Sequence, residues 1–519
     1  MSRFTRARGL AAVAAIAAAA LALAACSGAG TGGGTTPADT SKLVIGLDSD
    51  QAALGYDPLR YAAGQRMFFE GVYDSLFTLD KSGAIVPDLA TKATYNKDQT
   101  ELTLDLDTKA TFSDGSTLSA GLVKKNLDDR NDSDLSAYSS FAKGGDNEIT
   151  DVTVVDDHTV TLHFSKPQPG FEANLAFPGG VIVGPKGVAD RASLSTNPDG
   201  SGPLQVDAKA SVKGNTYLLT KKAGDAAADA YPFDSYEFKV ITDPQARVNA
   251  AISGEVDLAY ITADTQQQAK SAGTGLVANA GTVMNLLPFD KSGALAPQWG
   301  DPRVFKALSI AIDRDAFVKA VHPGEVPTAN ALPKDNPGYI PALEDEYAYD
   351  PEGAKKLLAE AGYPNGFSFD FFITAGSQRD LEAIQSYWKA VGVTVNLKTA
   401  SSTEEAFAAV QTTPLGGPIA LTWTNPAANV FGVLFGFANY HKAKNDGIQA
   451  AAGAYGAATD DAAKKAALTD LNKAIVGSGW LIPLFDQLSP WAFDKKKVAE
   501  PTFPGADSFP LLSTLAPAS

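Results

Sequence analysis

Hydrophobic and polar residues alternate along two short stretches in the first half of the chain. In TELTLDLD, residues 100–107, three leucines fall on one face and the intervening threonine and aspartates on the other. HTVTLHF, residues 158–164, repeats this period of two. Because such a period is typical of a strand with one buried face, we predict two half-buried strands in a sheet-rich region. KLVIGL at 42–47 and YEFKVI at 236–241 predict two further strands.

The apolar spacing changes to a helical period in the middle of the chain. Asp301 and Asp350 each precede a proline, which places a capping side chain before a residue suited to the first helical turn. We therefore predict helices at these two points and a third after Asp313. FSFDFFI and VGVTVNL, on either side of a predicted helix through Trp388, indicate strands. Alternating strands and helices predict an α/β fold with a mixed sheet.

Two further stretches predict helices by composition and spacing. Residues 61–77 have an amphipathic pattern that ends in YDSLF, and the alanine-rich stretch 450–467 is typical of helix. The chain shows no internal repeat of the length found in solenoid proteins.

The first forty residues predict export rather than a part of the fold. Three arginines precede an uncharged run, 10–25, that is shorter than the roughly 20 residues a membrane-spanning helix needs. The sequence Leu-Ala-Ala-Cys ending at Cys26 resembles a bacterial lipobox, which implies cleavage of a signal peptide, 1–25, and a lipid on the cysteine sulfur. The alternative is an ordinary secretory signal with a chance cysteine. The small, polar segment 26–41 predicts a flexible tether.

Composition narrows the classes of protein that fit. Cys26 is the one cysteine of the chain, so no disulfide can form within it. The formal net charge of −16 argues against nucleic acid and against electrostatic binding to anionic lipid. No later apolar stretch is long enough for a membrane span, so we expect a globular body outside the cytoplasm that is anchored to the outer face of the cell membrane only by its lipid.

Six blocks in one order carry a resemblance to a known family. They include the Phe-Ser-Asp-Gly block, the Ser-Gly-Glu-Val-Asp-like block and the Ile-Pro-Leu block, and they occupy residues 86–120, 200–204, 252–260, 301–321, 349–366 and 481–485. Together they resemble the family 5 extracytoplasmic solute-binding proteins of ABC importers, a group that includes dipeptide- and oligopeptide-binding proteins. Two positions depart from the family pattern, Gly121 and Leu204.

The resemblance implies a fold and a mode of action. The fold would be α/β and two-lobed, of the periplasmic-binding-protein type II class (cluster C), with an extra sheet-rich subdomain in the first lobe at about 61–195. The first lobe would comprise 42–280 plus 485–519, and the second 281–484. A monomer would close around a small solute or peptide and present it to the permease subunits of an ABC importer, with no cofactor and no metal.

Family position also suggests ligand-binding residues in the second lobe. Peptide-binding relatives carry a Trp-x-x-Asp segment whose aspartate pairs with the free amine of the peptide. Here Trp423 and Thr424 match, Asn425 follows, and no carboxylate stands between Pro418 and Lys442. Because a neutral amide cannot neutralise a buried ammonium, we expect a neutral or amine-free ligand, such as a sugar or a capped peptide. The alternatives are core packing for Trp423 and a turn before proline for Asn425.

Four more ligand-binding candidates come from family position alone. Tyr56 follows the first predicted strand, Asn285 follows the crossover into the second lobe, and Phe485 stands at the return. Thr374 opens a small polar loop after FSFDFFI. Each of the four has a purely structural role as its alternative.

The sequence favours a binding protein over an enzyme. His158 and His163 lie five residues apart on one predicted strand and so face opposite sides, and neither HExxH nor GxSxG occurs. A lipid on Cys26 leaves no free thiol as a nucleophile. A lipoprotein receptor that binds a solute or signal peptide without a transporter is the first alternative, and a secreted hydrolase is the second.

Overall fold

The structure is a computed structural model of the whole chain, which divides into two units, Met1–Ala38 and Asp39–Ser519. The residues it describes all belong to the second unit and are 40–61, 63–107, 109–132, 148–373, 377–399, 411–423, 426, 428–458, 460–505 and 507–518. The predicted signal peptide and Cys26 lie outside them. Within these ranges, no helix combines the length and the apolar character that crossing a membrane requires.

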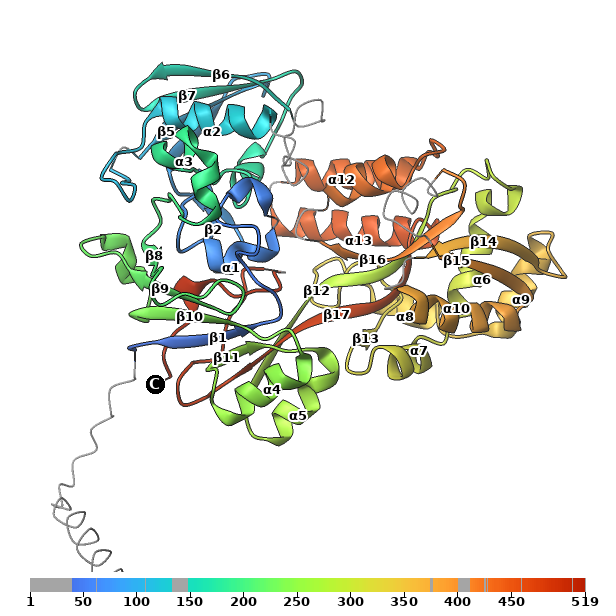
Figure 1. The fold of residues 1–519 in the computed structure, drawn as a ribbon. Coiled ribbons are helices and arrows are strands. Elements are labelled where there is room, and N and C mark those ends of the chain that lie inside the picture. The colour runs from blue at the N-terminus through green and yellow to red at the C-terminus, as the bar shows by residue number, and fades with distance from the viewer. Residues whose placement is uncertain are drawn as a thin grey trace, which may run out of the picture. The chain divides into compact units, whose positions relative to one another are not determined.

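Nine of the described strands form one mixed sheet (Figure 1). Their order is β16-β12-β17-β11-β1-β10-β9-β8, and β13 pairs with β17. β1 (Leu43–Leu47) runs parallel to β10 (Ser235–Val240) and β11 (Leu258–Tyr260), whereas the other pairs are antiparallel. The predicted strands at 42–47 and 236–241 and the mixed sheet are thus confirmed. The remaining strands are β8 (Leu204–Val206), β9 (Thr216–Lys221), β12 (Gly275–Pro288), β13 (Val326–Pro327), β16 (Leu415–Thr422) and β17 (Ile482–Phe493).

A second, antiparallel sheet confirms the sheet-rich region. Its order is β4-β5-β7-β6, and helix α2 (Ala120–Asp132) packs on one face of it (Figure 1). Leu102 and Leu104 of β5 are fully buried, as the period of two predicts. The elements of this part of the chain are β2 (Phe77–Leu79), β3 (Ile85–Pro87), β4 (Ala90–Tyr95), β5 (Glu101–Leu106), β6 (Ile149–Asp156), β7 (Thr159–Phe164), η4 (Phe171–Leu175), α3 (Pro185–Ala189) and η5 (Arg191–Ser195).

The capped helices form where their aspartates predict them. Asp301, Asp313 and Asp350 each accept a hydrogen bond from a backbone N–H of the first turn, at 2.8–2.9 Å. Strands β14 (Phe367–Ile373) and β15 (Val393–Thr399) pair in parallel, with α10 (Gln378–Ala390) between them along the chain. The other helices from the first sheet onward are η6 (Ala226–Ala230), α4 (Pro244–Ser253), η7 (Ala263–Thr265), α5 (Gln266–Ser271), η8 (Pro297–Gly300), α6 (Pro302–Ile310), α7 (Arg314–Val321), α8 (Pro341–Glu346), α9 (Pro351–Glu360), η10 (Ala428–Phe437) and η11 (Leu512–Thr514).

The helix predicted over 61–77 is wrong for most of its length. Only η2 (Ala63–Gln65) and α1 (Arg66–Phe69) are helical, preceded by η1 (Pro58–Arg60). The chain leaves the helix because the carbonyls of Gly71 and Val72 accept hydrogen bonds from a distant segment, the N–H groups of Leu204 and Gly202, at 2.7 and 3.1 Å. A tertiary backbone pairing therefore overrides the local amphipathic pattern.

The alanine-rich stretch 450–467 belongs to two helices rather than one. They are α12 (Asp446–Ala457) and α13 (Asp461–Gly477), which lie side by side (Figure 1). Asp460 caps the second by accepting a hydrogen bond from the N–H of Ala463 at 2.8 Å. An N-cap of this kind starts a new helix and so divides a segment whose composition is helical throughout.

Two large hydrophobic cores hold most of the buried side chains. One is built from residues between Leu286 and Phe485, and the other from residues between Leu43 and Leu258 together with the C-terminal stretch from Trp491. Strands β12 and β17 contribute to both, since β17 places Leu484 and Phe485 in the first core and Trp491 in the second. These two strands are therefore the physical link between the cores.

Candidate functional site

The carboxyl ends of three parallel strands mark one edge of the main sheet. β1 lies between β10 and β11, and the connection through α4 passes from one of its neighbours to the other. Ligands of open α/β sheets bind outside such carboxyl ends, where successive connections diverge. The segment that follows β1 carries Tyr56, one of the predicted ligand residues.

Most polar groups at this edge are engaged by the protein itself. Asp50 accepts hydrogen bonds from the Tyr217 hydroxyl at 2.7 Å and from the N–H of Ala52 at 3.0 Å. The buried Arg247 guanidinium donates to backbone carbonyls, including that of Tyr260. Gln51 is also buried, and within the described residues its side-chain oxygen has no hydrogen-bond partner. This edge thus offers one uncommitted buried acceptor.

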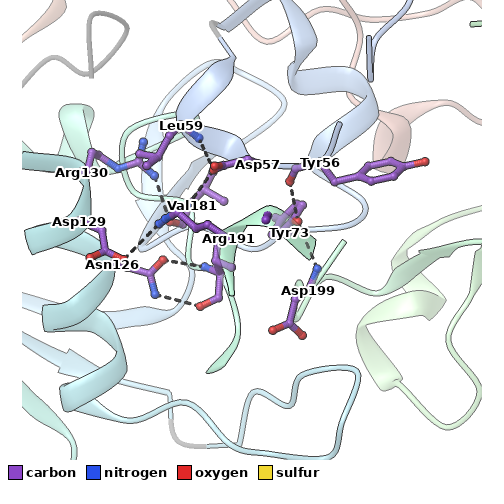
Figure 2. A network of polar contacts seen from close by, with 12 residues as sticks. Tyr56, Asp57, Leu59, Tyr73, Asn126, Asp129, Arg130, Val181, Arg191 and Asp199 are labelled. Atoms are coloured by element: carbon purple, nitrogen blue, oxygen red, sulfur yellow. Dashed lines mark hydrogen bonds and ion pairs between the residues drawn. The ribbon is translucent and has the colours of Figure 1, made fainter. Parts of the chain in front are cut away.

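Tyr56 is held through its backbone rather than through its hydroxyl. Its N–H donates to the carbonyl of Leu194 at 2.6 Å, and its own carbonyl accepts from the Tyr73 hydroxyl at 2.7 Å. The ring is 8% exposed and stacks on Phe68. Burial, and secondarily the charge of Asp50, raises the pKa of the Tyr56 phenol. Figure 2 shows the ring directed away from the neighbouring charged groups.

The residue after Tyr56 anchors a network of charged and polar side chains (Figure 2). Asp57 accepts hydrogen bonds from Arg191 at 2.8 Å and from the N–H of Leu59 at 3.1 Å. Arg191 also reaches Asp129 of α2 at 3.5 Å. The network therefore ties the loop that bears Tyr56 to the helix of the four-stranded sheet, which is a positioning role.

Helix α2 adds two further contacts to this network. Arg130 donates to the carbonyl of Val181 at 3.3 Å, and burial lowers the pKa of its guanidinium to about 10. The Asn126 amide is satisfied on both sides, because it donates to the carbonyl of Val183 at 2.9 Å and accepts from the N–H of that residue at 3.0 Å. Both contacts join α2 to one stretch of backbone, so the network is built to hold elements together.

Asn285 lies at an irregular point of the link between the cores. It is fully buried in β12, and the strand register shifts on both sides of it, toward β16 and toward β17. Its side-chain nitrogen donates to the carbonyl of Val283 at 2.7 Å, whereas its oxygen has no partner within the described residues. An unsatisfied buried acceptor costs free energy, so this position can accept a donor from elsewhere at little further cost.

Phe485 and Trp423 are both core residues. Phe485 is 1% exposed, and its ring lies 4.4 Å from the ring of His322, measured between centroids. Trp423 is 3% exposed, and its indole nitrogen has no partner within the described part of the chain. The strands that carry Phe485, Asn285 and the residue before Trp423 are neighbours in one sheet. The structure thus brings three of the predicted site residues to one three-strand patch, with Tyr56 in the other core.

Four predicted residues lie outside the described residues: Thr374, Thr424, Asn425 and the lipidation candidate Cys26. Their proposed roles stay predictions.

Two backbone segments approach each other closely beside the three-strand patch that carries Phe485. The turn after α7 places Gly324 at φ +99°, and a Cβ built there would lie 2.2 Å from the carbonyl oxygen of Ala263 in η7. Glu325 accepts a hydrogen bond from the N–H of Leu488 in β17 at 2.6 Å, and burial raises the pKa of this carboxyl to about 7. His322 pairs with Asp380 at 2.6 Å. The turn is therefore fixed to β17 and abuts the backbone of η7.

A cavity of about 330 Å³ lies next to β17, and none of the ligand-binding residues predicted from the sequence lines it. Asp486, the residue after Phe485, lines it together with Glu344 and Tyr339. The available signal was a carboxylate at the end of the apolar run LIPLF, since charged residues rarely occupy buried strands without a partner.

Burial dominates the electrostatics of Asp486. It is the main reason that the pKa of the carboxyl is raised to about 7, and the charges of Glu344 and Asp335 act in the same direction. A hydrogen bond from the backbone N–H of Lys334, at 3.1 Å, and the charge of Lys334 act in the opposite direction. Across the described residues, no three His, Cys, Asp or Glu side chains are placed to share a metal ion.

The profile of the bacterial extracellular solute-binding proteins, family 5, matches residues 84–465. Among curated proteins, the glutathione-binding protein GsiB of Pectobacterium atrosepticum is 28% identical over 64% of this chain, and GsiB of Salmonella typhimurium is 26% identical over 64%. The matched regions span 64% and 65% of those relatives' own lengths.

Solved structures share the fold at low sequence identity. HbpA2 from Haemophilus parasuis has a TM-score of 0.76 at 20% identity, covering 92% of this chain and 100% of its own. AgaA of A. tumefaciens R10, in complex with agropinic acid, gives 0.68 at 23%, covering 92% and 99%. DppA from Helicobacter pylori, in complex with the peptide STSA, gives 0.70 at 19%, covering 93% and 99%. The predicted α/β, two-lobed binding-protein fold is confirmed, and the chain belongs to the bacterial extracellular solute-binding proteins, family 5.

Proposed function

We propose that this protein captures a small solute outside the cytoplasm and presents it to the permease subunits of an ABC importer. The observation that carries the proposal is the family match over 84–465 on a fold shared with solute-loaded binding proteins. GsiB, AgaA and DppA are each named as binding proteins, so we expect no turnover of the solute. A lipid on Cys26 would hold the body at the outer face of the membrane.

The two cores support a hinged mechanism. We assign the first lobe to 42–280 plus 485–519, with the sheet-rich subdomain inside it, and the second lobe to 281–484. β12 and β17 join the cores, and the register shifts beside Asn285 interrupt the ladder that would otherwise stiffen this link. A solute stabilises the closed form only by the amount by which it binds that form better than the open one.

We infer the class of ligand from the absence of a carboxylate in the segment after Trp423. GsiB is named for glutathione, and the DppA neighbour holds a peptide, whereas AgaA holds agropinic acid. In this chain the segment after Trp423 carries Asn425 and no carboxylate before Lys442. An ammonium buried beside neutral groups alone would cost several kcal/mol, of order 3–5. We therefore propose a ligand without a free amine, such as a sugar or a capped peptide.

A thermal-shift series on the purified protein tests this proposal. It compares sugars and N-acetylated dipeptides with the same dipeptides unblocked. A ligand at a hundredfold excess over its Kd should stabilise the protein by about 2.7 kcal/mol. We expect the neutral set to give the larger shifts, and strong shifts with unblocked dipeptides would contradict the argument from Asn425.

A matched variant sharpens the same experiment. Asn425→Asp introduces a carboxylate into the segment after Trp423 without changing the size of the side chain, one position before Pro426, which stands where the relatives carry their aspartate. We expect N425D to gain affinity for unblocked dipeptides and to lose none for neutral solutes that bind elsewhere in the site. An unchanged preference in N425D would show that this segment does not contact the ligand.

A further inference from the structure

The cavity beside β17 contains a buried acid that the fold leaves unneutralised. Asp486 is 1% exposed, and one carboxylate oxygen accepts from the N–H of Lys334 at 3.1 Å. The other oxygen is buried and has no hydrogen-bond partner within the described residues. Because a carboxylate can accept about four hydrogen bonds, most of the capacity of Asp486 is unused.

The two cations that line the cavity among the described residues, Arg314 and Lys334, do not form an ion pair with this acid. The Arg314 guanidinium, also buried, donates to the carbonyls of Pro483, Ser309 and Tyr347 at 2.9–3.2 Å and to the Ser309 hydroxyl at 2.7 Å. The contact between Lys334 and Asp486 is made by the backbone, and the residue is otherwise exposed. Neither residue cancels the charge of Asp486 by a direct ion pair.

A second acid in the cavity is fully engaged. Glu344 accepts hydrogen bonds from the hydroxyls of Thr328 and Tyr339 at 2.7 and 3.0 Å, from the Asn330 amide at 2.7 Å and from the N–H of Ala329 at 2.8 Å. These four donors engage the carboxylate of Glu344 with protein groups, and its charge acts on Asp486 across the cavity. The wall next to Asp486 is therefore acidic, and among the described residues that line it one oxygen of Asp486 is the buried acceptor without a hydrogen-bond partner.

Aromatic rings complete the lining. Tyr339, Tyr347 and Tyr349 all border the cavity, and Tyr347 is buried whereas Tyr349 is 47% exposed. Rings attract an organic cation through their faces, in addition to burying its apolar part. A bare metal ion fits less well, because the described residues place no three metal-binding side chains together.

We propose that this cavity is an accessory binding site for a small organic ammonium, with Asp486 as the anion that receives the charged nitrogen and the tyrosines as its walls. The site goes beyond the proposed capture of a solute between the lobes, because none of the residues predicted to contact that solute lines the cavity. Its volume of about 330 Å³ admits a compact amine carrying one ring.

Benzylamine and benzyl alcohol test the proposal on the purified protein. The two probes have nearly the same shape, and at pH 8 only the first is charged. Isothermal titration calorimetry should detect binding of benzylamine and at least tenfold weaker binding of benzyl alcohol. This comparison uses the unmodified chain and so does not depend on the folding of any variant. Equal affinities, or no binding of benzylamine, would overturn the proposal.

Two substitutions locate the site. Asp486→Asn keeps the acceptor for the N–H of Lys334 and removes the charge, so it should weaken benzylamine binding at least tenfold. Asp335→Asn removes an exposed acid nearby that does not line the cavity, and it should leave the affinity within twofold of the unmodified protein. Full benzylamine binding in D486N, with circular dichroism showing a folded chain, would place the amine elsewhere and refute the assignment.

Discussion

Two buried aspartates of this protein differ in the hydrogen-bond partners that the fold supplies to their carboxylates. Asp57 is 5% exposed and Asp486 is 1% exposed, so depth hardly separates them. Asp57 has the guanidinium of Arg191 at 2.8 Å and a backbone N–H at 3.1 Å. Asp486 has one backbone N–H and an oxygen without a partner in the described residues. The partner, not the burial, therefore distinguishes an acid that holds elements together from one that is open to a ligand.

The surroundings repeat this contrast. Around Asp57, arginine and asparagine side chains of α2 and η5 are directed at protein groups, and Figure 2 shows them joining separate segments of chain. Near Asp486, the buried Arg314 instead donates its hydrogen bonds to backbone carbonyls. Substitutions that remove one charge at a time should expose the difference.

The largest effect is expected from Arg191→Met. It leaves the buried Asp57 carboxylate with the N–H of Leu59 as its remaining donor among the described residues, and removing the partner of a buried charge costs about 3 kcal/mol. Urea unfolding followed by circular dichroism measures the loss. The double variant D57N/R191M is the control and should recover part of it, because the uncompensated charge is gone. A loss below about 1 kcal/mol would show that the ion pair is not structural.

Asp486→Asn should have the opposite sign at neutral and higher pH. The folded-state pKa of Asp486 is about 7, above the ordinary value of 3.8. The folded protein therefore loses stability as pH rises between these two values, since only the unfolded chain has given up its proton. D486N lacks that loss, so at pH 8 it should be more stable by about 1–3 kcal/mol, and near pH 4 the difference should vanish.

Unfolding of both proteins at pH 4, 6 and 8 checks this sign. A D486N variant that is less stable than the unmodified protein at pH 8 would mean that the Asp486 charge is compensated in the folded state.

Amine binding should follow the ionisation of the same group. Below pH 7 the Asp486 carboxyl is mostly protonated and cannot neutralise an ammonium, and above pH 7 it is mostly charged. Benzylamine affinity should therefore rise by about tenfold between pH 6 and pH 8, because the binding-competent fraction rises by that factor. Calorimetric titrations at the two pH values measure it. An affinity independent of pH would remove Asp486 from the site.

The smallest effect is expected at the surface. Lys42 and Glu237 form an ion pair at 2.5 Å, but the lysine side chain is 46% exposed. Solvent screens such a pair, so Lys42→Ala should change the free energy of unfolding by less than about 1 kcal/mol. A loss as large as that of R191M would contradict the view that the burial of Asp57 gives the Asp57–Arg191 pair its weight.

The helices and strands of the fold could largely be predicted from local sequence patterns. Alternation over 100–107 and 158–164 predicts β5 and β7, and the aspartates before Pro302 and Pro351 predict two helix starts that the structure confirms. These signals are local, because each depends on residues within one element. The amphipathic stretch 61–77 misleads for the opposite reason, since its helix is cut short by hydrogen bonds from residues more than a hundred positions away.

The site was less accessible than the fold. Family position selects Tyr56, Asn285, Trp423 and Phe485, and three of these share one patch of the sheet. No local pattern shows that the Asn285 oxygen and one Asp486 oxygen are buried without partners among the described residues, because that property depends on which donors other segments supply. The sequence shows an acid, Asp486, at the end of an apolar run, but it does not show that one oxygen of this acid lacks a partner among the described residues.

The close approach at Gly324 has a practical consequence. Any side chain there would meet the carbonyl of Ala263, and the backbone at φ +99° already favours glycine. The two segments belong to different proposed lobes, so a methyl group at position 324 would prevent their close approach by a steric clash. The substitution G324A would then favour the open conformation, so that the empty cleft could be studied even when ligand is present.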